Sequence, residues 1–366
     1  MKSSPILVLF LIAIYASGCS NSEDYTTVNP DKIALGKQIF FDTSLSRPAG
    51  QSCATCHAPE NGFSDPSHQV ISEGAVASSF GNRNAPSLAY NVLSPIRSYN
   101  TVDETFVGGL FLDGRSPNLQ EQFIHPMLNP VEMNNTSRAE IATKIKQAPY
   151  YKTLVVLYGN SPFEDDLLHH VADALFSYQS SEMVNPFTSK YDYYLQGRAT
   201  LSLAEKKGLV LFENKAKCAL CHVTEPDPIQ RKVLFTDFTY DNIGIPRNPN
   251  NPFYAQPATI NPYGSNYVDL GIGAIVSQAT HNGKFKVPTL RNIAISAPYF
   301  HNGSIATLEK AVRFYNRRDL HTGEFGAPEV GQNVNREELG NLKLTEEDEA
   351  NLVAFLKTLT DGYRKP

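Results

Sequence analysis

The chain contains one five-residue pattern twice, Cys-x-x-Cys-His, at Cys53–His57 and again at Cys218–His222. These patterns use four of the five cysteines, and the fifth is Cys19 near the amino terminus. Four cysteines could form two disulfides in an exported protein, but a histidine directly after each pair has no role in that interpretation. In a c-type haem site, two thiols bond the porphyrin and the adjacent histidine binds the iron. We therefore predict two covalently attached haems c. The residues that would hold them are Cys53, Cys56, His57, Cys218, Cys221 and His222.

The first residues have the features of an export signal. After Lys2, an apolar run ends at Tyr15, too short to span a bilayer, and small residues follow it. The sequence Ala-Ser-Gly-Cys ending at Cys19 resembles a bacterial lipobox, so we predict that residues 1–19 are a signal peptide and that Cys19 carries a lipid. Residues 20–30 would then be a tether outside the fold. This predicts a protein of the periplasm or cell envelope that contacts the membrane only through its lipid.

Length and charge narrow the possible functions. The chain has 366 residues, of which 41% are hydrophobic and 19% charged, which is typical of a soluble globular protein with room for two domains. Its net charge is −5 and no basic run occurs, so we expect no nucleic-acid partner.

Features around the first pattern recur around the second. A glycine with apolar residues at the third and fourth positions after it occurs at Gly36–Phe40 and at Gly208–Phe212, each before a haem motif. Ser202 and Glu205 form a capping-box pattern that predicts a helix from Leu203.

Each half also closes with a helical apolar pattern. The apolar positions are Leu168, Val171, Ala172, Leu175 and Phe176 in the first half and Leu352, Val353, Phe355, Leu356 and Leu359 in the second. The second helix is predicted to start at Thr345, with Asp348 in its first turn.

These repeats predict a mainly α fold with two cytochrome c-like haem domains and long irregular loops. The domains would cover residues 31–185 and 186–366, with the boundary in Asn185–Gly197. Residues 227–283, rich in Pro, Asn and Gly, would form the longest irregular region, and strands should be few and short.

The group opposite each histidine decides what a haem can do, because two strong ligands favour electron transfer and an open position permits chemistry with a small molecule. The methionines are Met1, Met127, Met133 and Met183, so none follows the second motif. The downstream segment can therefore offer the second haem a histidine, a tyrosine, a neutral group or nothing. The histidine candidates are His281, His301 and His321.

Peroxide cleavage on a haem requires a group that moves a proton between the two oxygens, and a carboxyl with a shifted pKa can do so. Glu132 lies beside Val131 and Met133, an apolar setting that would raise its pKa.

With these features, the chain resembles the bacterial diheme cytochrome c peroxidase/MauG family over about residues 31–359. The matching segments are Leu35–Asp42, Cys53–His57, Arg83–Leu88, Asp113–Arg115, Pro130–Asn134, Cys218–His222, Val287–Asn292 and Ala297–Gly303.

The resemblance implies a role for each half. His57 would hold the N-terminal haem that binds hydrogen peroxide, with Gln122 and Glu132 in its distal pocket and Glu132 as acid and base. His222 would hold the C-terminal haem that relays electrons. The resemblance also implies a calcium ion between the domains. Its protein ligands would be Asn84, Ser296 and Pro298.

Two differences within the family distinguish this chain. Tyr315 stands where the peroxidases have a methionine ligand to the relay haem, which is the MauG-type choice. The segment in which peroxidases carry a distal histidine, residues 70–80, contains none, and His68 lies too early to align with it. We therefore predict a peroxidatic haem that is open without reductive activation.

A further difference concerns the path between the haems. The tryptophan that the family usually has before Asp-Gly-Arg is Leu112 here. Electrons would then tunnel directly or use Phe111 or a tyrosine.

Three hypotheses follow. The first is a peroxidase that takes electrons from a small cytochrome c or cupredoxin. The second, which Tyr315 favours and Leu112 disfavours, is a MauG-like oxidase that modifies a partner protein. The third is an electron carrier without turnover, which the missing distal histidine disfavours.

Overall fold

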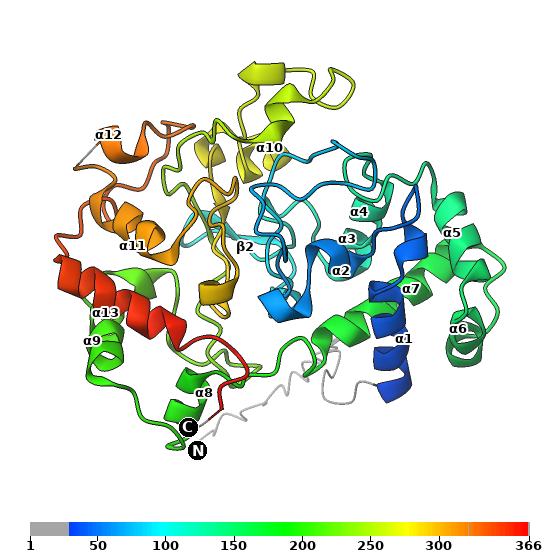
Figure 1. Cartoon of the computed structure of the whole chain (residues 1–366), viewed down its shortest axis with the longest axis horizontal. Coiled ribbons are helices and arrows are strands. Elements are labelled where there is room, and N and C mark those ends of the chain that lie inside the picture. The colour runs from blue at the N-terminus through cyan, green and yellow to red at the C-terminus, as the bar shows by residue number, and fades with distance from the viewer. Residues whose placement is uncertain (1–28, 321, 365–366) are drawn as a thin grey trace, which may run out of the picture.

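The computed structural model describes residues 29–320 and 322–364 (Figure 1). The predicted signal peptide and Cys19 lie outside these residues, so both remain predictions. The α-helices are α1 (Pro30–Phe40), α2 (Cys53–Cys56), α3 (Leu119–Gln122), α4 (Ile124–Leu128), α5 (Arg138–Gln147), α6 (Tyr151–Tyr158), α7 (Glu164–Ser180), α8 (Lys190–Leu195), α9 (Leu203–Glu213), α10 (Ile272–Val276), α11 (Leu308–Arg317), α12 (Thr322–Phe325) and α13 (Glu346–Lys357).

Sheet structure is confined to two short antiparallel ribbons in the described part of the chain. One pairs β1 (Ser98–Asn100) with β2 (Thr105–Val107), and the other pairs β3 (Tyr240–Asp241) with β4 (Phe285–Lys286). In the first ribbon, Tyr99 lies opposite Phe106. The prediction of a mainly helical chain with few strands is confirmed.

The predicted helix starts are confirmed as well. α9 begins at Leu203, where the Ser202 hydroxyl accepts from the Glu205 amide and the Glu205 carboxylate accepts from the Ser202 amide at 2.6 Å. α13 begins after Thr345 with the same reciprocal pair, completed by Asp348. Each box satisfies amides that the first helical turn leaves without a partner.

Each half is built around one close helix crossing, α1 with α7 and α9 with α13. A Cβ added to Gly36 would lie 1.9 Å from the carbonyl oxygen of Ala174, and one added to Gly208 would lie 2.0 Å from that of Asn351. Neither position has room for a larger residue unless the helices separate, which explains the glycine before each haem motif.

Two clusters of buried hydrophobic residues accompany these crossings. The first is formed mainly by residues before Asn185, and the second contains Phe212, Phe314 and Phe355 from α9, α11 and α13. Tyr191 of α8 belongs to the second cluster, whereas Leu234 and Phe238 join the first.

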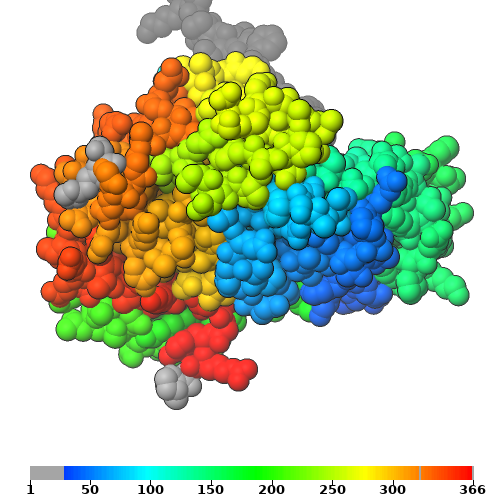
Figure 2. Space-filling view, turned by 45° about the horizontal axis from the view of Figure 1, so that its top comes forward, coloured from blue at the N-terminus to red at the C-terminus, as the bar shows by residue number. Residues whose placement is uncertain are grey.

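The long irregular region of the second half packs over the first half. In Figure 2, yellow-green residues of this region lie against light-blue residues of the first half. Asn251 donates to the carbonyl of Asn82 at 2.9 Å, and Arg83 forms an ion pair with Asp269 at 2.7 Å. The irregular region therefore joins the two halves instead of projecting into solvent.

Candidate haem and peroxide site

The four motif cysteines are unpaired thiols in the described structure. Cys53 is the first and Cys56 the last residue of the short helix α2. Cys218 begins a 3-10 turn that ends at Leu220. Burial raises the pKa of each thiol to about 12. Both pairs are thus partly buried, neutral thiols that form no disulfide among the described residues.

The motif histidines are oriented in the same way. The Nδ1 atom of His57 lies 3.3 Å from the carbonyl oxygen of Phe63, and that of His222 lies 2.9 Å from the carbonyl oxygen of Phe235. A backbone hydrogen bond of this kind leaves Nε2 available to a metal. Burial lowers the pKa of both imidazoles, that of His222 to about 4, so each ring is the neutral form that binds iron.

A second repeat supports these histidines, and the sequence comparison of the two halves did not detect it. Ser87 donates to the carbonyl of Gly62 at 2.5 Å, and Thr289 donates to that of Leu234 at 2.6 Å. In each half, the hydroxyl thus fixes the residue that precedes a phenylalanine, and the carbonyl of that phenylalanine accepts a hydrogen bond from the motif histidine. The signal was present as Pro-Ser-Leu at 86–88 and Pro-Thr-Leu at 288–290.

A cavity of about 280 Å³ surrounds the second motif. Cys218, Cys221 and His222 lie in its wall, which is otherwise mostly apolar. Two thiols and a neutral imidazole around a large apolar cavity fit a covalently bound haem.

Tyr315 of α11 lies in the wall of the same cavity. Burial raises the pKa of its phenol, and the residue shares this wall with Cys218 and Cys221 of the second motif. Of the predicted histidine candidates, His301 also lines the cavity, whereas His281 packs against Phe106. His321 is not among the described residues.

Glu132 lies near the first motif. It is flanked by the buried side chains of Val131 and Met133, and burial raises the pKa of its carboxyl against the opposing charge of Arg115. The charge of Glu132 in turn raises the pKa of Cys56, so the two groups are close. The apolar setting predicted for Glu132 is therefore present.

Gln122 is the last residue of α3 and is partly exposed. Its side chain makes no hydrogen bond to any residue that the structure describes. Its amide group is therefore available to a ligand.

The loop that would carry a distal histidine closes over the backbone of Glu132. The Ala75 amide donates to the Glu132 carbonyl at 2.7 Å, and a Cβ on Gly74 would lie 2.5 Å from the Val131 carbonyl oxygen. His68 has both ring nitrogens occupied, Nδ1 by the Ala297 carbonyl at 2.8 Å and Nε2 by Asn61 at 3.1 Å.

The three residues predicted to bind calcium line a common cavity. Asn84, Ser296 and Pro298 all border the cavity of the second motif. Asn84 is buried, and its Nδ2 donates to the carbonyls of Gln69 and Val70 at 3.2 and 3.0 Å, which leaves its Oδ1 as an acceptor. No cluster of three His, Cys, Asp or Glu residues suited to a metal occurs among the described residues. A site built from amide and carbonyl oxygens uses none of those four residue types, and oxygen ligands of this kind suit Ca²⁺.

Leu112 and Phe111, which lie between the two motifs in the sequence, line the cavity of the second motif.

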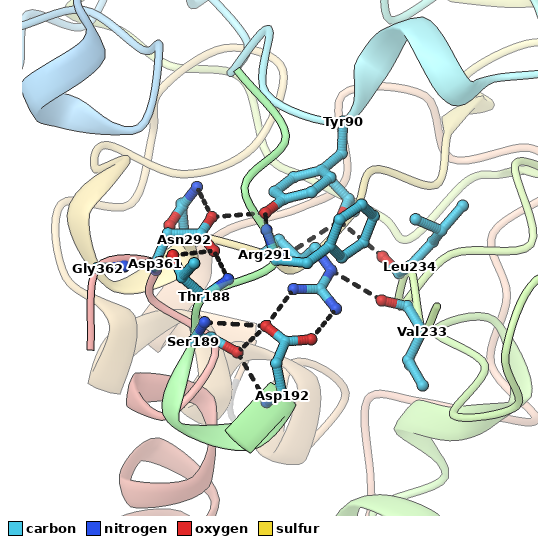
Figure 3. Close-up of polar contacts among 12 residues, drawn as sticks. Tyr90, Thr188, Ser189, Asp192, Val233, Leu234, Arg291, Asn292, Asp361 and Gly362 are labelled. Carbon is cyan, nitrogen blue, oxygen red and sulfur yellow. Dashed lines mark hydrogen bonds and ion pairs between the residues drawn. The ribbon is translucent and has the colours of Figure 1, made fainter. Parts of the chain in front are cut away.

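A buried ion pair in the second half was not predicted from the sequence. Arg291 is 1% exposed and forms two hydrogen bonds with Asp192, at 2.8 and 2.9 Å (Figure 3). Its Nε donates to the carbonyl of Val233 at 2.7 Å. No local pattern pairs residues 99 positions apart in this way.

Comparisons with known proteins agree with this geometry. Residues 30–200 match the family model described as Di-haem cytochrome c peroxidase. The chain is 35% identical to the methylamine utilization protein MauG of Paracoccus denitrificans, covering 97% of this chain and 95% of MauG. It is 28% identical to the cytochrome c551 peroxidase of Nitrosomonas europaea, covering 92% of this chain and 81% of that protein.

Among solved structures, the diheme peroxidase BthA of Burkholderia thailandensis superposes with a TM-score of 0.79 at 34% identity, covering 92% of this chain and 87% of that chain. A MauG-like protein associated with microbial copper homeostasis superposes with a TM-score of 0.70 at 29% identity, covering 92% of this chain and 91% of that one. The chain therefore belongs to the diheme cytochrome c peroxidase/MauG family of oxidoreductases.

Proposed function

We propose that this protein reduces hydrogen peroxide to water at the His57 site, with electrons that arrive through the His222 site from a small cytochrome c or cupredoxin. A haem at each motif would supply the iron, which binds peroxide at one site and carries electrons at the other. The reaction consumes two electrons and two protons for each peroxide and releases two waters.

The observation that carries this proposal is the carboxyl of Glu132 beside the first motif. Its raised pKa suits a group that takes the proton from the inner oxygen of peroxide and returns it to the outer oxygen, which then leaves as water. The free amide of Gln122 would orient the peroxide by a hydrogen bond. His68, with both ring nitrogens occupied, is not free to close this site.

At the second site we assign Tyr315 as the residue that would hold the iron together with His222, because both line the cavity that also contains Cys218 and Cys221. An anionic oxygen ligand stabilises oxidised iron and lowers its potential relative to methionine. We also assign one Ca²⁺ to Asn84 and the carbonyls of Ser296 and Pro298.

A second candidate is a MauG-like oxidase that uses peroxide to modify a partner protein. Tyr315 and the 35% identity to MauG favour it. Leu112, which stands in the place of the family's inter-haem tryptophan, disfavours it.

We assign the protein to the periplasm or cell envelope, held by a lipid on Cys19. Within the described residues, no helix has the length and apolar character that crossing a membrane requires.

Optical and EPR spectra of the ferric holoprotein test the proposal. We expect one high-spin and one low-spin haem, and we expect peroxide to be consumed without prior reduction. Two low-spin haems that do not react with peroxide would contradict both enzyme hypotheses and support an electron carrier.

A further inference from the structure

We propose that Tyr90 is a redox-active tyrosine between the two haem sites, which gives up an electron to the oxidised haem pair and its phenolic proton to Asp361. This inference rests on the proposed function, since peroxide supplies the oxidising equivalents.

Tyr90 lies on a segment that contacts both sites. Earlier in this segment, the Leu88 amide donates at 3.0 Å to the carbonyl of Phe63, the same oxygen that His57 contacts. Tyr90 itself is 1% exposed and lies in the wall of the cavity that contains His222. Tyr90 is therefore close to the second site and only two residues from a group that supports the first.

The phenol has a built proton acceptor. Its hydroxyl donates to Oδ2 of Asp361 at 2.7 Å (Figure 3). The same carboxylate accepts from Asn292 Nδ2 and from the Thr188 amide, each at 2.9 Å, so it is held in place. The amide of Phe187 donates to the phenol oxygen at 3.0 Å and fixes it from the other side.

The positive charge of Arg291 beside the Tyr90 ring favours loss of the phenolic proton together with the electron. The guanidinium of Arg291, which is paired with Asp192, lies 4.9 Å from the ring centroid of Tyr90. A fixed positive charge disfavours a cationic tyrosine radical. Burial raises the pKa of Tyr90 above its ordinary value despite the opposing effect of Arg291, so the starting group is the neutral phenol.

The O–H bond of Tyr90 would break, its proton would bond to Oδ2 of Asp361, and one electron would leave the ring for the oxidised haems held at the two motifs, which would gain one reducing equivalent. The product is a neutral tyrosyl radical hydrogen-bonded to a protonated carboxyl. An electron from the donor protein, with return of the proton, restores the phenol.

The test uses the ferric holoprotein mixed with one equivalent of hydrogen peroxide, freeze-quenched and examined by EPR. We expect a tyrosyl radical in the native protein and its loss in Tyr90→Phe. Asp361→Asn keeps the ring and removes the proton acceptor, so the radical yield should also fall. Haem optical spectra and thermal unfolding of each variant establish that it is folded and loaded.

Tyr158→Phe is the matched control, because Tyr158 donates to Asp173 at the same 2.7 Å and does not line the cavity. The radical should persist in this variant. Peroxide consumption without any protein radical, or a radical that survives in Tyr90→Phe, would overturn the inference and leave the proposed function standing. If peroxide is not consumed, the proposed function and this inference fail together.

Discussion

The two halves of the molecule support their motif histidines in the same way and differ on the opposite side. In both, a glycine permits a close helix crossing, a phenylalanine carbonyl accepts from the histidine, and a hydroxyl holds the preceding residue. Beyond this scaffold, the first half presents Glu132 with a raised pKa, whereas the second presents Tyr315 in a cavity. The repeated scaffold is what we expect for haem attachment in both halves, and the unmatched residues are the basis of the different roles proposed for them.

The largest expected effect comes from the carboxyl that only the first half has. Glu132→Gln should slow the reaction with peroxide by roughly 10²–10⁴-fold, because the proton relay is lost while shape is kept. Stopped-flow measurement of the ferric protein with peroxide provides the rate. Glu60→Gln changes an exposed glutamate near the same motif and should leave that rate unaltered. An unchanged rate in Glu132→Gln would remove this residue from the mechanism.

The next largest effect concerns the buried ion pair of Arg291 with Asp192, which the first half lacks. In the first half, Ala89 occupies the position that matches Arg291. Asp192→Ala leaves the buried guanidinium of Arg291 without its partner and should lower the free energy of unfolding by about 3–5 kcal/mol. Thermal or denaturant unfolding measures this change. Asp165→Ala, which breaks an exposed pair with Arg138, should cost about 1 kcal/mol or less. Equal losses in the two variants would mean that the buried pair has no special role.

A smaller effect should be shared by both halves. Gly36→Ala and Gly208→Ala each place a methyl group against a backbone carbonyl of the crossing helix, so each should lower the free energy of unfolding by about 1–3 kcal/mol. Gly323→Ala, where a Cβ would meet open space, is the control and should not destabilise the fold. A large loss in only one of the two variants would show that the halves do not use the same crossing.

The smallest effect on stability should accompany the clearest change in spectrum. Tyr315→Phe removes a hydroxyl without altering the ring, so the unfolding free energy should change by less than about 1 kcal/mol. The low-spin haem should change its optical and EPR spectrum, and its reduction potential should rise. Tyr299→Phe is the comparison, because Tyr299 lines the same cavity but donates to the carbonyl of Ile293. Identical spectra in native protein and Tyr315→Phe would exclude the hydroxyl as a ligand.

Local patterns predicted much of this molecule. The capping boxes at Ser202 and Thr345 located two helix starts, because capping depends on residues three positions apart. The apolar residues beside Glu132 in the sequence predicted a raised pKa for its carboxyl, and burial raises that pKa in the structure.

What the sequence by itself determined was the pair of Cys-x-x-Cys-His motifs, the helical class of the chain and the repeated glycine before each motif. Only the tertiary structure decided which distant groups meet, as Arg291 does with Asp192 and Tyr90 with Asp361. The physical reason is that these contacts depend on how the two halves and the irregular region pack together. Such packing leaves no periodic signal in the chain, whereas helix caps and motif spacings are set within a few residues.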